Sequence, residues 1–437
     1  MKHSFNRFSA LALCALSILA GCSNVSASSA ASSSAAAAPS AQSSSNVSAS
    51  SEEQKEIVFW STKEDVFADQ TAIFTEQTGI SVNATYMGGY DDMVNKVMAG
   101  IAANSLPDVA QLGQRHGVSQ MYDSGKLLAV EDKLPQELLN DILPGFWKRF
   151  TYKGKKVILP FQNSMPVLYY NADLFEQAGV TEIPITFDQV VSTAKTIVDA
   201  TGVYGFTTAE DSPWYINALV YNAGSDLVTD DNKAVANNDA VRSIFAAYQQ
   251  MATVDMSMAP NQHATAKEDF ANGRVAMLMT SCASYANLTE LVDGKFELKV
   301  AQFPSITTMD IPMGGNGLGL FASTPEKEDW AVEFVEFMLE PERVAQSTLN
   351  TGYIPVTNAA IATDTYKTYL EDPNRQVIHD QLQYLGGRAV NPADSLVWSE
   401  VLGLIDTVEA DPDADITAEL AKIDEKVQKY LDEYAGQ

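Results

Sequence analysis

An alternation of strand-like and helix-like apolar segments restricts the fold of this chain more than any other sequence feature. Between residues 56 and 112, short runs rich in branched and aromatic residues alternate with amphipathic runs at helical spacing. The expected elements, in chain order, are a strand, a helix, a strand, a helix and a strand at 56–60, 66–78, 80–86, 90–103 and 107–112. This order predicts a parallel sheet covered by helices.

The length of the chain predicts two lobes of this kind. Residues 55–437 exceed the size at which a single hydrophobic core stops growing. The strand and helix pattern resumes at 157–178, and a charged amphipathic helix is expected at 416–434. We therefore expect an α/β fold with two lobes, each built on a mainly parallel sheet that is flanked by helices.

The start of the chain has the pattern of an export signal. Lys2 and Arg7 provide positive charge, and the apolar run at 8–20 follows. This run is shorter than the roughly 20 apolar residues that a membrane-spanning helix needs. We therefore interpret 1–21 as a signal peptide that is absent from the mature protein.

The tetrapeptide Leu-Ala-Gly-Cys that ends at Cys22 resembles the bacterial lipobox. The resemblance implies that Cys22 is lipidated and anchors the protein to the outer surface of the cell membrane. An ordinary signal peptide with an incidental cysteine is the alternative. Residues 23–51 are almost entirely Ser and Ala and carry no charge, so 22–54 is expected to be a disordered tether.

Charge and cysteine content exclude several classes of protein. The formal net charge of -28 argues against binding to nucleic acid or to anionic lipid, both of which require clustered Lys and Arg. Cys282 is the one cysteine beyond the start of the chain, so a disulfide within the folded body is not expected. No Cys or His spacing predicts a zinc site, and we expect neither a metal nor a cofactor. Cys282 is expected to be a buried free thiol rather than a nucleophile.

Polar side chains follow the expected strands. In open parallel sheets, ligands bind beyond the carboxyl ends of the strands. The segments at these positions carry hydroxyls, amides or an aromatic ring, and none places a nucleophile beside a base; they are 60–62, 113–115, 162–164 and 281–284. Such groups suit a sugar or polyol, whose hydroxyls pair with amides and whose apolar face stacks on aromatic rings.

Four sequence blocks carry a resemblance to a known family. They are Ile-Val-Phe-Trp at 57–60, Pro-Phe-Gln-Asn-Ser-Met-Pro-Val-Leu-Tyr-Tyr-Asn at 160–171, Asn-Gly-Arg-Val-Ala-Met at 272–277 and Thr-Gly-Tyr-Ile-Pro-Val at 351–356. From about residue 55 to the C-terminus, the chain resembles the family 1 extracellular solute-binding proteins of bacterial ABC importers. It is most similar to the branch that binds glycerol 3-phosphate and sugars.

The resemblance implies a type II periplasmic-binding-protein-like fold, with hinge strands between two lobes that close on a ligand. It places one lobe at 55–162 and 315–356, and the other at 163–314 and 357–437. It also implies a monomeric receptor without catalytic residues, which delivers a carbohydrate or glycerol phosphoester to the transmembrane subunits of an ABC permease.

Ligand-binding residues are carried over from the family one position at a time. Gln114 stands where the glycerol-phosphate branch has a glutamate, whereas Arg388 matches an arginine that pairs with the phosphate. These two positions leave a neutral saccharide and a glycerol phosphoester both open. The full set of expected contacts is Tyr90, Gln114, Asn163, Ser164, Trp214, Ser281, Ser284, Gly315, Tyr353 and Arg388.

A glycoside hydrolase and a sugar sensor are the alternatives to a transport receptor. A surface-anchored glycoside hydrolase needs two carboxyl groups that face the scissile bond, and the segments after the expected strands contain almost no Asp or Glu. A sugar sensor on the same fold, without a transport role, is compatible with the sequence. Both remain alternatives to the receptor of an importer.

Overall fold

The computed structural model describes residues 55–63, 67–113, 117–209, 212–260 and 263–436. All of them belong to one compact unit, Glu53–Gln437. The expected signal peptide and tether, with Cys22, lie outside the described residues, and so does Gln114.

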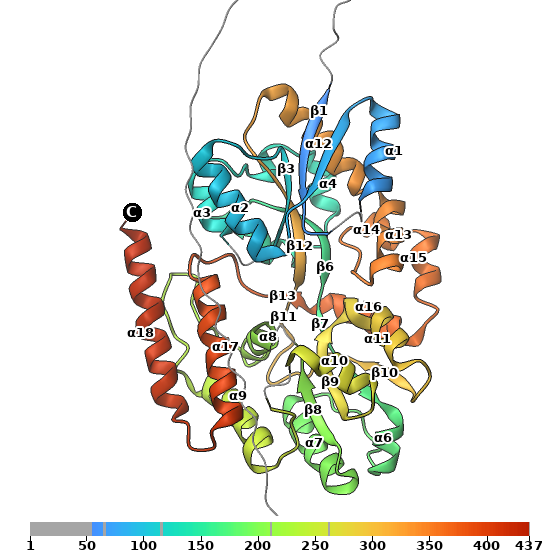
Figure 1. The fold of residues 1–437 in the computed structure, drawn as a ribbon, viewed down its shortest axis with the longest axis vertical. Helices are drawn as coiled ribbons and strands as arrows, with labels where there is room; N and C mark the ends of the chain where they lie inside the picture. The colour runs from blue at the N-terminus through green and yellow to red at the C-terminus, as the bar shows by residue number, and fades with distance from the viewer. Residues whose placement is uncertain (1–54, 64–66, 114–116, 210–211, 261–262, 437) are drawn as a thin grey trace, which may run out of the picture. The chain divides into compact units, whose positions relative to one another are not determined.

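A five-stranded sheet with the strand order β2-β1-β3-β12-β6 forms the centre of the first lobe (Figure 1). Its strands are β1 (Glu56–Ser61), β2 (Ser81–Tyr86), β3 (Val109–Gly113), β6 (Leu159–Ser164) and β12 (Gly314–Leu320). The helices that pack on it include α1 (Ala68–Thr78), α2 (Tyr90–Ala103) and α12 (Pro325–Met338). Because β1 pairs in parallel with β2 and β3, the expected strand–helix–strand–helix–strand unit is confirmed.

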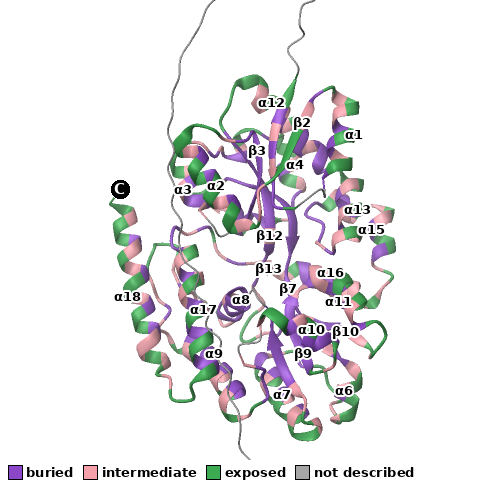
Figure 2. Cartoon of the chain, viewed as in Figure 1, coloured by how far each residue is buried: buried purple, intermediate pink, exposed green. Residues whose placement is uncertain are grey.

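Aromatic side chains hold the helices of the first lobe on its sheet. In β1, Ile57 and Phe59 are fully buried and lie on the same face. The ring centroid of Phe59 lies 5.3 Å from that of Phe334 in α12, which in turn lies 5.2 Å from the ring of Phe74 in α1. These edge-to-face contacts fix both helices against the strand, and the central strands are buried along most of their length (Figure 2).

A four-stranded sheet with the order β10-β7-β9-β8 forms the centre of the second lobe. Its strands are β7 (Pro166–Asn171), β8 (Tyr204–Thr208), β9 (Val275–Ser281) and β10 (Leu298–Ala301). The helices around it include α6 (Ala172–Gln177), α7 (Phe187–Thr201), α10 (Ala266–Ala271), α11 (Tyr285–Val292) and α16 (Pro373–Asp380). A further group of helices packs together beside this sheet and comprises α8 (Ser212–Asn222), α9 (Asp239–Gln249), α17 (Asp394–Ala410) and α18 (Ile416–Ala435).

Shorter elements connect these layers. The remaining α-helices are α3 (Val118–Asp123), α4 (Gln136–Asp141), α5 (Pro144–Trp147), α13 (Pro341–Thr351), α14 (Asn358–Ile361) and α15 (Asp364–Tyr369). Two strand pairs stand apart from the main sheets: β4 (Thr151–Tyr152) with β5 (Lys155–Lys156), and β11 (Ile311–Pro312) with β13 (Leu385–Gly386). Single turns of helix are η1 (Val130–Asp132), η2 (Lys148–Phe150), η3 (Gln250–Val254), η4 (His263–Thr265), η5 (Cys282–Ser284) and η6 (Gln381–Tyr384).

In each main sheet, one strand runs against all the others. In the first lobe this strand is β12, which is antiparallel to both β3 and β6. In the second lobe it is β7, which is antiparallel to β9 and β10. Both strands follow an element of the other lobe in the chain, so they enter their sheets from the opposite side. The expected helix-flanked sheets are confirmed, but the expectation of mainly parallel sheets is wrong. Both sheets are mixed, because β12 and β7, the strands at which the chain changes lobe, are antiparallel to both of their neighbours.

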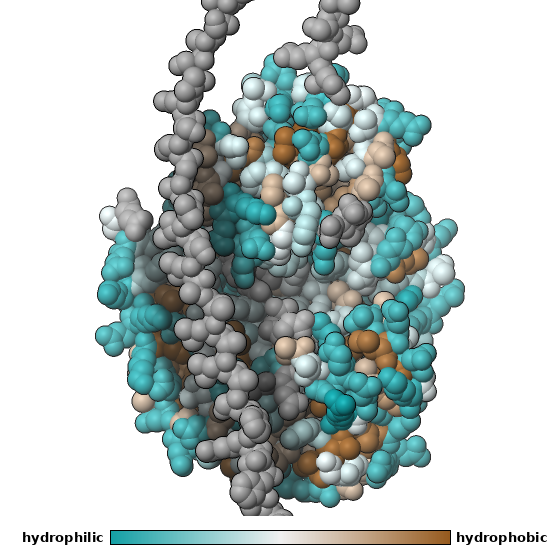
Figure 3. All heavy atoms as spheres, viewed as in Figure 1, coloured by the Kyte–Doolittle hydropathy of each residue, from teal (hydrophilic) through white to brown (hydrophobic). Residues whose placement is uncertain are grey.

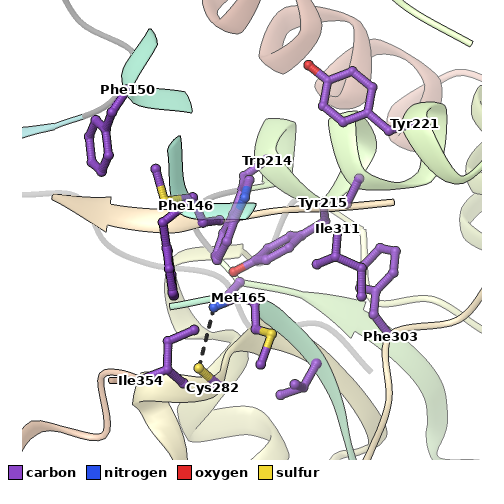
Figure 4. Packing of buried hydrophobic residues seen from close by; sticks show 14 of the residues in the cluster. Phe146, Phe150, Met165, Trp214, Tyr215, Tyr221, Cys282, Phe303, Ile311 and Ile354 are labelled. Atoms are coloured by element: carbon purple, nitrogen blue, oxygen red, sulfur yellow. Dashed lines mark hydrogen bonds between the residues drawn. The ribbon is translucent and has the colours of Figure 1, made fainter. Parts of the chain in front are cut away.

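Met165 is the single residue between β6 and β7, where the chain passes from one lobe to the other. It is fully buried, and its backbone N–H donates to the Sγ atom of Cys282 over 3.4 Å (Figure 4). Burial raises the pKa of the Cys282 thiol to about 12. Cys282 is therefore a buried free thiol, as expected, and packing around it joins the two lobes into a continuous core.

The surface agrees with the strongly acidic composition. Hydrophilic residues cover most of the face shown in Figure 3, and hydrophobic residues appear there as separate small patches. Among the described residues, no helix has both the length and the apolar character that crossing a membrane requires. The expected amphipathic helix near the C-terminus is confirmed as α18, which buries Leu420, Ile423, Val427 and Leu431.

Candidate functional site

A cavity of about 1000 Å³, here called the interlobe cavity, is bounded by residues of both lobes. The first lobe contributes Gln120 and Asp123 of α3 and the turn between β4 and β5. The second lobe contributes α8, the segment 227–232 and the last turn of α18. The remaining wall comes from β11, the start of α17 and residues 388–394. The volume lies at the upper end of the range that is usual for small-molecule sites, about 300–1,000 Å³.

One face of α8 lines the interlobe cavity with Trp214, Asn217 and Tyr221. Spacings of three and four residues place these side chains on the same side of the helix. The indole Nε1 of Trp214 donates to the carbonyl oxygen of Pro312 over 3.1 Å, which fixes the ring plane. The ring centroid of Trp214 lies 5.5 Å from that of Tyr215, and Figure 4 shows the two rings among buried hydrophobic residues.

Gly314 allows Trp214 to lie this close to the strand that crosses between the lobes. A Cβ atom at Gly314 would lie 2.6 Å from the indole ring and 3.1 Å from the hydroxyl of Ser164. The absence of a side chain is therefore required at this position. Ser164 is buried and is outside the lining of the cavity.

Arg388 lines the interlobe cavity and is held by two carboxylates. Its Nε donates to Asp226, and its Nη1 donates to Asp310 over 2.6 Å. The guanidinium also lies 4.5 Å from the centre of the Tyr221 ring. Burial acts to lower the pKa of Arg388, but hydrogen bonds from Asp310 and Asp226 outweigh it and raise the pKa. The arginine is thus charged and fully compensated within the protein.

Asp310 organises the loop that carries Arg388. Its second carboxylate oxygen accepts from the backbone N–H of Gly387 over 2.6 Å, and its own N–H donates to the side chain of Asn222. A Cβ atom at Gly386 would lie 1.9 Å from this carboxylate, and Gly387 adopts a φ of 96°. Two glycines are therefore needed for the loop to wrap around one carboxylate.

The other basic residues of the cavity wall are also paired. Arg149 lies 3.4 Å from the carboxylate of Asp394, and Lys153 lies 2.6 Å from that of Asp123. Asp230 adds a further carboxylate to the lining. Among the described residues, three cations of the wall thus face five carboxylates, including the two that hold Arg388. The electrostatic character of the cavity is acidic.

A buried network of side-chain amides joins β3, β6 and β12, close to the point where the chain passes from β6 to β7 and changes lobe. This point is called the crossing below. The side-chain NH₂ of Gln111 donates to Gln162 and to Asn316, each over 3.0 Å. The side-chain NH₂ of Asn316 donates in turn to the hydroxyl of Tyr90 over 3.0 Å. Tyr90 therefore contacts the crossing strands from α2, and it is outside the lining of the interlobe cavity.

Asn163 and Gly315 form a structural pair at the crossing. The side-chain NH₂ of Asn163 donates to the carbonyl oxygens of Gly314 and Asn316, and the Asn163 residue is fully buried. Gly315 adopts a φ of 92°, and a Cβ atom there would lie 2.1 Å from the carbonyl oxygen of Gln162. Both residues shape the bulge between β6 and β12.

The three remaining expected contacts lie near η5 and outside the lining of the interlobe cavity. The hydroxyl of Ser281 accepts from the N–H of Ala283 and caps η5, and Ser284 precedes α11. The backbone N–H of Tyr353 donates to the hydroxyl of Thr351 over 3.3 Å. Of the expected contacts that are described, Trp214 and Arg388 lie in the cavity wall, and the roles of the whole set in ligand binding stay predictions.

Several residues of the wall were missed by sequence reasoning. Asn217 and Tyr221 carry a usable signal, since they follow Trp214 at helical spacing. Asp226 and Asp310 carry no such signal, because they lie 162 and 78 residues from Arg388 in the chain. The cavity wall also contains the carboxylates of Asp123, Asp230 and Asp394, which come from segments other than those that follow the expected strands.

Comparisons with known proteins agree with this architecture. A family model described as bacterial extracellular solute-binding protein matches residues 69–375. The maltotriose-binding protein of Pyrococcus abyssi is 26% identical over 361 residues, which are 78% of this chain and 74% of the relative. The sn-glycerol-3-phosphate-binding periplasmic protein UgpB of Escherichia coli is 26% identical over 315 residues, 65% of this chain and 69% of the relative.

A solved structure supports the fold directly. UgpB from Mycobacterium tuberculosis, in complex with glycerophosphocholine, superimposes with a TM-score of 0.75 at 22% identity, covering 87% of this chain and 99% of that one. The expected type II arrangement of two α/β lobes is confirmed by this similarity. The resemblance that the sequence blocks carry is confirmed as well.

Proposed function

Because this chain belongs to the bacterial extracellular solute-binding protein family, we propose that it is the receptor of an ABC importer for a neutral oligosaccharide. The ligand binds in the interlobe cavity and is passed to the transmembrane subunits of the permease. The proposed lobes are 55–162 with 315–356, and 163–314 with 357–437. One relative binds maltotriose and another binds sn-glycerol 3-phosphate. The choice between these two classes of ligand therefore rests on the residues in the wall of the cavity.

We propose a neutral ligand because Arg388 is already paired with two carboxylates, those of Asp226 and Asp310. A phosphate that approached this guanidinium would have to displace Asp226 or Asp310, or bind beside them. Either arrangement brings like charges together in a partly buried site, where they repel. A saccharide hydroxyl meets no such cost, because it donates to carboxylates and amides.

Aromatic and acidic side chains of the wall suit a saccharide of several rings. Trp214, Tyr221 and Trp398 provide apolar surface for sugar faces, while Asp230 provides an acceptor for hydroxyl groups. A volume of about 1000 Å³ exceeds what a single small solute needs. These features favour an oligosaccharide over glycerol 3-phosphate.

The receptor is proposed to bind its ligand without reaction. A glycosidase requires a carboxylic acid with a raised pKa as its proton donor. Burial acts to raise the pKa of Asp123, but hydrogen bonds from Lys153, Tyr434 and Tyr152 outweigh it and lower the pKa. Asp123 is therefore ionised and ill suited to protonate a leaving group.

Thermal shift and calorimetric titration test the proposal on the purified protein. The ligand panel contains maltose, maltotriose, glycerol 3-phosphate and glycerophosphocholine. We expect saturable stabilisation by a neutral saccharide, since a ligand that binds only the native state stabilises it by about 2.7 kcal/mol at 100 times its Kd. Stabilisation by the phosphoesters alone, or release of shorter sugars on long incubation, contradicts the proposal.

The receptor is further proposed to be anchored to the cell membrane through lipidated Cys22. The support is the lipobox-like tetrapeptide and the uncharged Ser- and Ala-rich segment that follows it. Membrane fractionation and intact mass of the expressed protein test this. The wild type is expected to partition into detergent with an acylated mass, and Cys22→Ser to be released without lipid. An unmodified Cys22 in the mature wild type contradicts the anchor.

A further inference from the structure

Two asparagines of α8 have opposite environments. Asn222 is fully buried, and its side chain accepts from the N–H of Asp310 and donates to the carbonyl oxygen of Pro304. Asn217 lies in the wall of the interlobe cavity, and its Oδ1 is buried without a hydrogen-bond partner among the described residues. The oxygen and the nitrogen of the Asn222 amide thus both have partners, whereas the oxygen of the Asn217 amide has none among the described residues.

An unsatisfied buried acceptor lowers stability, by about 1–3 kcal/mol for a neutral group. A buried polar group without a partner in a native protein therefore calls for an explanation, and binding of a ligand is one. We propose that Asn217 is a specificity-determining residue, whose amide pairs with a hydroxyl group of the bound saccharide. This inference rests on the proposed function and adds a contact that selects for carbohydrate.

The surroundings of Asn217 fit this role. Trp214 precedes it by three residues and Tyr221 follows it by four, so one amide lies between two aromatic side chains on a single helix face. A sugar ring that stacks on either aromatic ring presents equatorial hydroxyls at its edge, where the amide lies. Rotation about the Cβ–Cγ bond of Asn217 turns its oxygen or its nitrogen to the cavity without movement of α8.

The chemistry of the amide gives selectivity among hydroxyl ligands. The Asn217 oxygen accepts up to two hydrogen bonds and its nitrogen donates two, so the side chain pairs with vicinal hydroxyls that donate and accept together. A site built to pair with a hydroxyl rejects an analogue that lacks it, because the protein group is then left unpaired. Deoxy sugars that lack the matching hydroxyl are therefore expected to bind weakly.

Substitution by leucine separates a ligand-binding role from a structural one. Asn217→Leu removes the unsatisfied acceptor and keeps the branched arrangement of side-chain heavy atoms, so the unliganded protein is expected to melt at the same temperature as wild type or higher. Its Kd for the saccharide identified by the ligand panel is expected to rise at least about tenfold, the loss typical of one hydrogen bond to a ligand. Asn217→Ala serves as a second variant if leucine does not fit.

Asn222→Leu is the matched control on the same helix. It removes an amide that is fully paired, so the melting temperature of the unliganded protein is expected to fall by several degrees. If Asn217→Leu and Asn217→Ala lower the melting temperature as Asn222→Leu does, Asn217 is structural and the inference is wrong. Unchanged affinity in a folded Asn217 variant also overturns it. Wild-type protein that binds only phosphoesters rejects the proposed function instead, and the Asn217 variants are then compared on that ligand.

Discussion

His263 is a mostly buried contact between segments that meet beside the cavity-forming helices. Its Nδ1 lies 2.9 Å from the carbonyl oxygen of Thr208 and 3.0 Å from the hydroxyl of Ser212, which begins α8. Its Nε2 lies 3.2 Å from the carboxylate of Glu409, a residue of α17 whose side chain is fully buried. One imidazole therefore joins the end of β8, the start of α8 and α17.

The protonation state of His263 follows from these contacts. Burial acts to lower its pKa, but the hydrogen bond and charge of Glu409 outweigh burial, with the Thr208 carbonyl and the charge of Asp406 acting in the same direction. The pKa in the folded protein is consequently raised above its ordinary value of 6.5. Glu409 and Asp406 of α17 are the charged groups that face the imidazole, and Thr208 and Ser212 are the polar ones.

We predict that the free energy of unfolding decreases as pH rises through the neutral range because of His263. A group with a raised pKa in the folded state contributes its full stabilisation below its unfolded pKa, and this contribution is lost as pH rises through the folded pKa. Chemical denaturation at pH 5.5 to 8.5 measures the effect. His263→Gln is expected to abolish this part of the pH dependence, whereas His379→Gln, which removes a histidine that meets Tyr366, is expected to retain it. Parallel profiles for wild type and His263→Gln would rule out this role.

At the level of secondary-structure elements, α18 connects the two lobes across the interlobe cavity. It packs on α17 and α9 of the second lobe. Its last turns reach the first lobe, where the hydroxyl of Tyr434 donates to Asp123 over 2.7 Å and that of Tyr430 accepts from Gln120 over 3.0 Å. The same Asp123 carboxylate accepts from Tyr152 and Lys153, so it is held in place to receive Tyr434.

We predict that these two hydroxyls favour the closed arrangement of the lobes. In the double variant Tyr430→Phe with Tyr434→Phe, the unliganded protein is expected to have a larger radius of gyration by small-angle scattering. The Kd for ligand is expected to rise about three- to tenfold, because one exposed and one partly buried hydrogen bond contribute about 1 kcal/mol together and the closed state is less populated. Tyr86→Phe, at an exposed residue of β2, is the control. A scattering curve identical to wild type argues against the connection.

Elements were predicted better than the contacts between them. The strands and helices of residues 56–112 appear close to their expected bounds, because their apolar spacing depends only on neighbours in the chain. The direction of β12 and β7 was not predictable in this way, since it depends on where the chain enters each sheet. Tyr90 accepts a hydrogen bond from Asn316 in the buried amide network, a contact that the sequence did not predict, and its expected contact with ligand stays a prediction.

For the whole molecule, the two lobes are joined by a continuous core rather than by an exposed linker. Met165, Phe161 and Val167 are buried where the chain first changes lobe, and they belong to the same hydrophobic cluster as the cores of both sheets. Relative movement of the lobes therefore has to occur through the crossing strands, as in hinge closure around a ligand. Contacts at the far side of the cavity, such as those of α18, are free to form and break as the lobes move.

By itself, the sequence determined the order of strands and helices, the two-lobed class of fold and the family, because these depend on local spacing and on ordered blocks such as 160–171. It also identified Trp214 and Arg388, which both lie in the cavity wall. Only the tertiary structure decided what surrounds them. Asp226 and Asp310 meet Arg388 from distant parts of the chain, and Asn217 is left unsatisfied while Asn222 is paired. Charge compensation and hydrogen-bond satisfaction depend on groups that only folding brings together. The spacing of residues in the sequence therefore does not predict which groups pair.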